Sequence, residues 1–167
     1  METILTTAQV LFSLFTSLAV GGSTLAVLSV LHAFKDGALD ASERSMLGVI
    51  YFVLRVAMGA LLVLAVFLWW MGGAPFTAPL SGFACAAFTM LGVLYVNALL
   101  MTLHYMPFKI GPAIQAGAWY TLGSGAALMG AGVRVSYTMY IVLYLILVLV
   151  FAAVISGYMK YYVQKAG

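Results

Sequence analysis

The chain has very few charged residues, and acidic residues are the scarcest. Asp, Glu, Lys and Arg make up 7% of its 167 residues, whereas about a quarter of a soluble globular domain is charged. All four acidic residues fall within the first 43 positions, so no carboxylate side chain follows Glu43. A chain that is 65% hydrophobic cannot cover itself with polar surface in water. These properties exclude a soluble domain and indicate that lipid is the solvent of this chain.

Other features that would indicate particular functions are also missing. The single cysteine, Cys85, leaves no disulfide framework. The seven Lys and Arg residues are scattered and form no basic patch, so we expect no nucleic-acid partner. The apolar segments contain no carboxylate pair, Ser-His-Asp set or cluster of metal ligands. We therefore expect no hydrolytic activity, and the sequence leaves any other enzymatic activity open.

Five long apolar segments follow one another along the chain. They cover residues 8–33, 45–71, 80–106, 110–133 and 137–159. Each is long enough for the roughly 20 residues that a helix needs to cross the hydrocarbon core. No polar block between them is large enough to fold separately. The sequence predicts an all-α integral membrane protein with one domain over residues 1–167, a bundle of five transmembrane helices in a lipid bilayer.

The basic residues between these segments predict which way the chain is oriented. With five crossings, Arg134 lies on one side of the membrane, and the other side holds Lys35, Arg44, Lys109, Lys160 and Lys165. Because cytoplasmic loops carry the excess of Lys and Arg, we expect the N-terminus outside and the C-terminus inside. The expected location of this multi-pass protein is the plasma membrane of a prokaryotic cell.

Two of the segments carry further packing signals. Gly117, Thr121 and Gly125 recur at four-residue spacing and predict a face for tight helix contact. The last segment, residues 137–159, is the most apolar, and we expect it to be the most exposed to lipid.

Arg55 is the one charge well inside an apolar segment. An ionisable residue within a membrane helix is by default a candidate for function. Arg55 shares a helix face with Gly48 and Gly59, and small residues line helix contacts in membranes, so we expect this face to pack inside the bundle. Since no carboxylate lies in the membrane segments, its expected partner is an external anion or a lipid phosphate.

Other polar residues fall at a similar depth. His32 and His104 lie near the cytoplasmic ends of the first and third segments, and Asn97 lies deeper in the third. Gln115 lies just past the cytoplasmic start of the fourth segment, followed by Trp119. Together with the arginine, these residues predict a polar pocket in the cytoplasmic half of the membrane.

The two histidines favour a b-type haem as the occupant of this pocket. Haem iron accepts axial histidines from the helices of a bundle, so His32 and His104 are the expected iron ligands. Lys35 and Lys109 lie just beyond them and, with Arg55, could meet the haem propionates. This interpretation predicts an electron-transfer protein or an accessory redox subunit.

Two other classes of function remain open. The first is an oligomeric channel or small transporter, either for an anion held at Arg55 or for Cu(I), which soft ligands select. The candidate copper ligands are Met90, Met101, Met106 and His104. The second is a non-catalytic assembly subunit that forms a homo-oligomer or packs against a partner membrane subunit.

Overall fold

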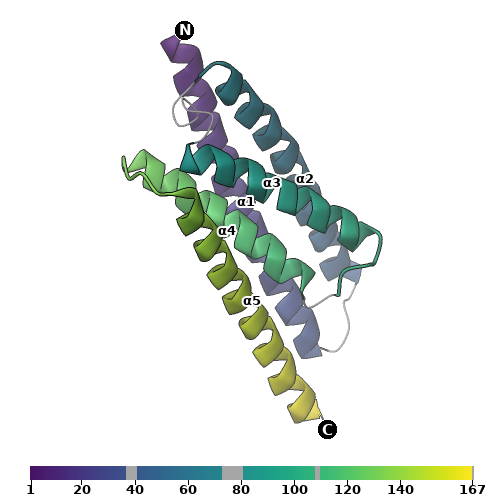
Figure 1. The fold of residues 1–167 in the computed structure, drawn as a ribbon. Coiled ribbons are helices and arrows are strands. Elements are labelled where there is room, and N and C mark those ends of the chain that lie inside the picture. The colour runs from purple at the N-terminus through teal and green to yellow at the C-terminus, as the bar shows by residue number, and fades with distance from the viewer. Residues whose placement is uncertain (37–40, 73–80, 108–109, 167) are drawn as a thin grey trace.

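The described part of the chain consists of helices. The computed structural model describes residues 1–36, 41–72, 81–107 and 110–166, and these form five helices and no strand (Figure 1). The helices are α1 (Glu2–Asp36), α2 (Ala41–Trp70), α3 (Gly82–Thr102), α4 (Gly111–Gly130) and α5 (Tyr137–Ala166). The prediction of an all-α protein is confirmed for these residues. Both α1 and α5 extend past the predicted apolar segments, because hydropathy marks the part of a helix that suits lipid rather than its full length.

Four of the helices are long and apolar enough to cross a membrane. They are α1, α2, α3 and α5, and they identify a multi-pass membrane protein whose outer surface suits a lipid bilayer. α4 does not reach the same apolarity, because glycines, Gln115, Trp119 and Tyr120 dilute its hydrophobic residues. α4 packs against α1, α3 and α5, so its own residues meet protein on several sides.

α4 is thus the central helix of the arrangement. α2 packs against α1 and α3, whereas α5 packs mainly against α4 (Figure 1). The two chain ends lie at opposite ends of the molecule. Side-chain hydroxyls also join helices directly: those of Thr24 in α1 and Tyr120 in α4 lie 2.8 Å apart, and those of Thr89 in α3 and Tyr137 in α5 lie 3.2 Å apart.

The small-residue face predicted on α4 is confirmed as a face of tight contact. A Cβ atom on Gly117 would lie 2.6 Å from Cγ2 of Val148 in α5. A Cβ atom on Gly125 would lie 2.7 Å from the ring of Phe83 in α3. Thr121 between them is buried, and its hydroxyl donates to the carbonyl of Gly117 at 2.7 Å. The lack of side chains here lets α3 and α5 approach the backbone of α4.

The prediction that the last helix is the most exposed is also confirmed. Among the membrane-span helices, α5 has the lowest buried share, 11% of its apolar window. Tyr140 and Ile155 are its fully buried side chains in the described range, and the others are half-buried or exposed. α5 therefore presents most of its apolar surface to its surroundings.

Candidate functional site

Arg55 lies at the middle of α2 on the outer side of the bundle. Its side chain is exposed, and no atom approaches within 4 Å of where a Cβ would stand on Gly48 or Gly59. The prediction that this face packs inside the bundle is therefore wrong. α2 instead buries the opposite face, where Leu54 and Leu61 are at most 1% exposed. Both the glycine face and the leucine face of α2 suit helix contact. Within this chain, the leucine face is the one that contacts other helices.

The surroundings of Arg55 on this outer face are apolar. Phe52 one turn before it is 67% exposed, and Leu62 two turns after it is 37% exposed. No hydrogen bond or ion pair joins Arg55 to another residue within the described ranges. The guanidinium is therefore a charge on an apolar part of the surface.

His32 lies near the end of α1 and is exposed. It lines a groove of about 500 Å³ together with Leu25, Leu28 and Ser29 of the same helix. Met46 of α2 and Tyr158 of α5 close the other sides of this groove. The groove is mostly apolar, and His104 is not among its lining residues.

His104 follows the end of α3 and has an unusual backbone conformation. Its φ is +59°, in the left-handed region that favours glycine. The amide of His104 donates to the carbonyl of Met101, and the amide of Tyr105 donates to that of Leu100. This is the Schellman pattern that ends many helices. At the end of α4 the same position and pattern are taken by Gly132, with φ +75°.

Replacing His104 with glycine should therefore stabilise the protein by about 1 kcal/mol, because glycine adopts the left-handed conformation without a Cβ penalty. Thermal unfolding in detergent measures this, with Gly132→Ala as the opposite control that should lower stability. A lower midpoint for His104→Gly would show that the imidazole makes a stabilising interaction. If His104 is a haem ligand, the same variant also loses the Soret band of the purified protein.

Of the remaining predicted polar residues, Asn97 lies at the contact of α3 with α4, and Gln115 and Trp119 lie on α4. Asn97 is 2% exposed, and its Nδ2 donates to the carbonyl of Gly111 at 3.0 Å and to the sulfur of Met101 at 3.6 Å. It thereby ties the first turn of α4 to α3. The Oδ1 of Asn97 and the Nε1 of Trp119 are buried without a partner among the described residues. Gln115 is half-buried.

Two of the predicted pocket residues, Arg55 and Asn97, lie apart in the structure. Arg55 faces outward from α2, whereas Asn97 is buried against α4. The Lys35 side chain and Lys109 lie outside the described residues.

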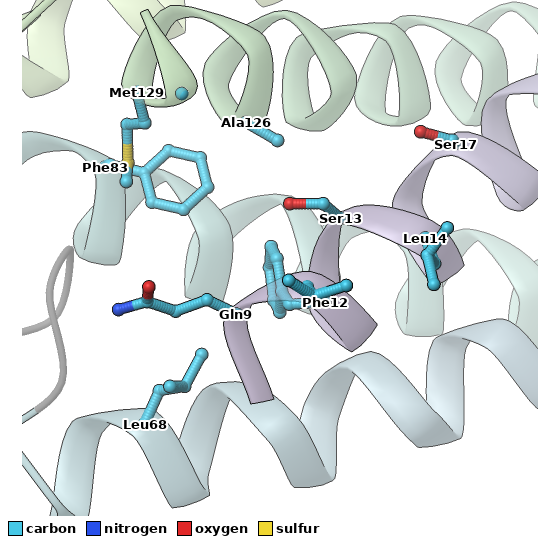
Figure 2. Close-up of a pocket in the computed structure, with 11 residues that line it drawn as sticks. Gln9, Phe12, Ser13, Leu14, Ser17, Leu68, Phe83, Ala126 and Met129 are labelled. Atoms are coloured by element: carbon cyan, nitrogen blue, oxygen red, sulfur yellow. The ribbon is translucent and has the colours of Figure 1, made fainter. Parts of the chain in front are cut away.

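A cavity with polar lining lies instead at the other end of the bundle, where α1 begins and α4 ends. It has a volume of about 420 Å³, and Gln9, Ser13 and Ser17 supply its polar side chains (Figure 2). Sequence reasoning missed this site, because Gln9 falls at the edge of the first apolar segment and the serines suit helix packing. The signal was the four-residue spacing of the three polar residues, which places them on one helix face.

Comparisons with known proteins add no identification. No family model, no curated protein and no solved structure matches this chain.

Proposed function

We propose that the chain is a non-catalytic subunit of a larger membrane assembly, which binds its partner through Arg55 on the outer face of α2. The observation that supports this is the exposed guanidinium at the middle of an apolar helix face, which has no partner among the described residues. The exposed position of Arg55 therefore supports a role in docking. The haem and transport interpretations remain predictions.

The depth of Arg55 in the membrane supports a partner for its charge. The apolar span runs from Arg44 to Trp70, so Arg55 lies 11 residues from one end and 15 from the other. At about 1.5 Å per residue, it is roughly 16 to 23 Å from the two ends of the span. A guanidinium near the centre of a membrane helix costs about 3 kcal/mol on insertion scales. Pairing with an anion offsets this cost.

The proposed partner is a transmembrane helix that carries one Asp or Glu at mid-depth. A second copy of this chain does not supply such a residue, because its acidic residues all precede Arg44 in the sequence. The open sites at Gly48 and Gly59, one on each side of Arg55, let the backbone of a partner helix come close. The charge of Arg55 and the open glycine sites beside it therefore both favour a closely packed transmembrane helix with an acidic residue.

A model helix in liposomes tests this pairing. A Leu/Ala transmembrane peptide with one central Asp is reconstituted with the full chain, which carries a photo-crosslinking residue at Phe52. Because a buried polar pair between membrane helices is worth about 1–2 kcal/mol, we expect about tenfold more crosslinking than with the Asn version of the peptide. Arg55→Leu should remove this preference.

Two controls keep the result specific. A crosslinker at Leu149 of α5, which is 69% exposed against 67% for Phe52, should show no preference for the Asp peptide. Arg134→Leu removes an arginine elsewhere and should leave the preference at Phe52 intact. Equal crosslinking of the Asp and Asn peptides by the unaltered chain, or a preference that survives Arg55→Leu, contradicts the proposal.

We further propose that α4 also crosses the membrane, which gives five crossings with the N-terminus outside and the C-terminus in the cytoplasm. The chain ends at opposite ends of the molecule and the packing of α4 among α1, α3 and α5 support this (Figure 1). The excess of Lys and Arg on one side supports the orientation. An N-terminal tag that proteases reach from the cytoplasmic side alone would contradict it.

A further inference from the structure

The cavity at the start of α1 is formed where two helices diverge. α1 and α4 touch at Val20 and Gly123, where a Cβ on the glycine would lie 2.8 Å from Cγ2 of Val20. The 2.8 Å contact between the hydroxyls of Thr24 and Tyr120 holds the same crossing one turn further along α1. On the other side of this crossing, α1 and α4 line a space of about 420 Å³ together with Leu68 of α2 and Phe83 of α3. That volume falls within the range of small-molecule sites.

The back of this cavity is aromatic and fixed. Phe12 of α1 and Phe83 of α3 meet edge to face, with ring centroids 6.1 Å apart. Phe83 meets Tyr140 of α5 in the same way, also at 6.1 Å. Gly125 of α4 lies against both Phe83 and Tyr140, so the rings have little room to move. This wall offers flat apolar surfaces to a ligand.

The α1 wall of the cavity offers hydrogen-bond donors. Figure 2 shows the Gln9 amide and the hydroxyls of Ser13 and Ser17 on this wall. Hydroxyls within helices often donate to the carbonyl four residues earlier, as those of Thr16 and Ser29 do here at 2.8 Å. Those of Ser13 and Ser17 make no hydrogen bond with any described residue, so they are available to a ligand.

The cavity is also open and uncharged. Val10 and Leu14 lie at its edge and are 54% and 59% exposed, so a molecule can enter from the surroundings of α1. None of its lining residues carries a charge. Because a charged headgroup would lose hydration here without gaining a counter-ion, the lining favours a neutral ligand.

We propose that this cavity binds an uncharged, carbonyl-bearing lipid, whose carbonyl oxygens accept hydrogen bonds from Ser13 and Ser17 while its apolar part lies on Phe12 and Phe83. Two sources have this chemistry, namely an isoprenoid quinone and a diacylglycerol. This site uses other residues than the proposed docking face on α2 and stands independently of it.

Binding of two short-chain probes to the full chain in nanodiscs tests the site. Decylubiquinone and 1,2-dioctanoylglycerol are titrated separately, with dioctanoyl-phosphatidylglycerol as the charged comparison. We expect saturable binding of at least one neutral probe and none of the charged one. Binding of decylubiquinone alone identifies the quinone as the source, and binding of dioctanoylglycerol alone identifies the diacylglycerol.

Substitutions in the cavity test whether the probes bind there. The double substitution Ser13→Ala and Ser17→Ala should weaken binding by about fivefold or more, because two hydrogen bonds are lost. Ala126→Leu fills the space from α4 and should abolish binding. Ser29→Ala, whose hydroxyl is already bonded within its own helix, should leave it unchanged.

The location can also be checked without relying on the folding of any variant. Diazirine-bearing versions of the probes should label peptides that contain residues 9–17 or 126–130 of the unaltered chain. Labelling confined to other segments overturns the proposal. Equal binding by the unaltered chain and Ala126→Leu, or saturable binding of neither neutral probe, overturns it too.

Discussion

Trp119→Ala is expected to destabilise the protein by about 3–5 kcal/mol, the range for deleting a large buried aromatic side chain. Trp119 is 0% exposed and is the largest fully buried side chain. It lies on α4, which contacts three other helices. The cavity left by the indole would therefore weaken the contacts of the central helix. Unfolding in detergent, followed by circular dichroism against temperature or denaturant, measures the loss.

Trp70 provides the matched control. It is 84% exposed at the end of α2, so Trp70→Ala should change stability by less than about 0.5 kcal/mol. Similar losses for the two alanine variants would contradict the central position of Trp119. Trp119→Phe keeps most of the ring and removes the buried N–H that lacks a described partner. It should cost about 1.5 kcal/mol or less.

Gly117→Ala is expected to have the second-largest effect, a loss of about 1–3 kcal/mol from overpacking. The added Cβ would lie 2.6 Å from Cγ2 of Val148 and 3.2 Å from its backbone nitrogen. The side chain can turn, but the backbone contact requires α5 to move away from α4. Because few other residues of α5 are buried, little else holds α5 against α4. The displacement should therefore weaken the contact between these two helices along its length.

Gly92→Ala is the matched control for this substitution. Gly92 also lies inside a helix, α3, but no atom lies within 4 Å of its Cβ position. Alanine favours the helix by up to about 1 kcal/mol over glycine, so Gly92→Ala should raise stability or leave it unchanged. If Gly117→Ala is as well tolerated as Gly92→Ala, α4 and α5 are not packed as closely as the 2.6 Å separation at Gly117 implies.

Hydropathy and residue size were enough to predict much of the fold. Long apolar runs predicted the five helices, because a backbone in lipid must satisfy its hydrogen bonds internally. The spacing of Gly117 and Gly125 predicted tight contact correctly, because a helix face that lacks side chains lets neighbouring helices come close. The abundance of small residues in α4 also fits its place among three neighbours.

The position of Arg55 could not be predicted in the same way. A glycine face can meet another helix of the same chain or remain open to a second molecule, and the sequence pattern is identical in both cases. The contact of Leu54 with Gly22, 3.3 Å from its Cβ position, shows which face of α2 meets α1. The cavity beside α1 could not be predicted from the sequence either. Its presence depends on how α1 and α4 diverge from their crossing, and no local motif encodes that.

The enclosed position of α4 also bears on how the chain enters the membrane. A segment partitions into lipid during synthesis according to its own apolarity, and α4 is the helix that falls short of a membrane span by that measure. In the five-crossing arrangement, α4 would therefore depend on α3, made before it, and α5, made after it, to stay in the bilayer. Biogenesis of this protein would then be complete only after the last helix had emerged from the ribosome.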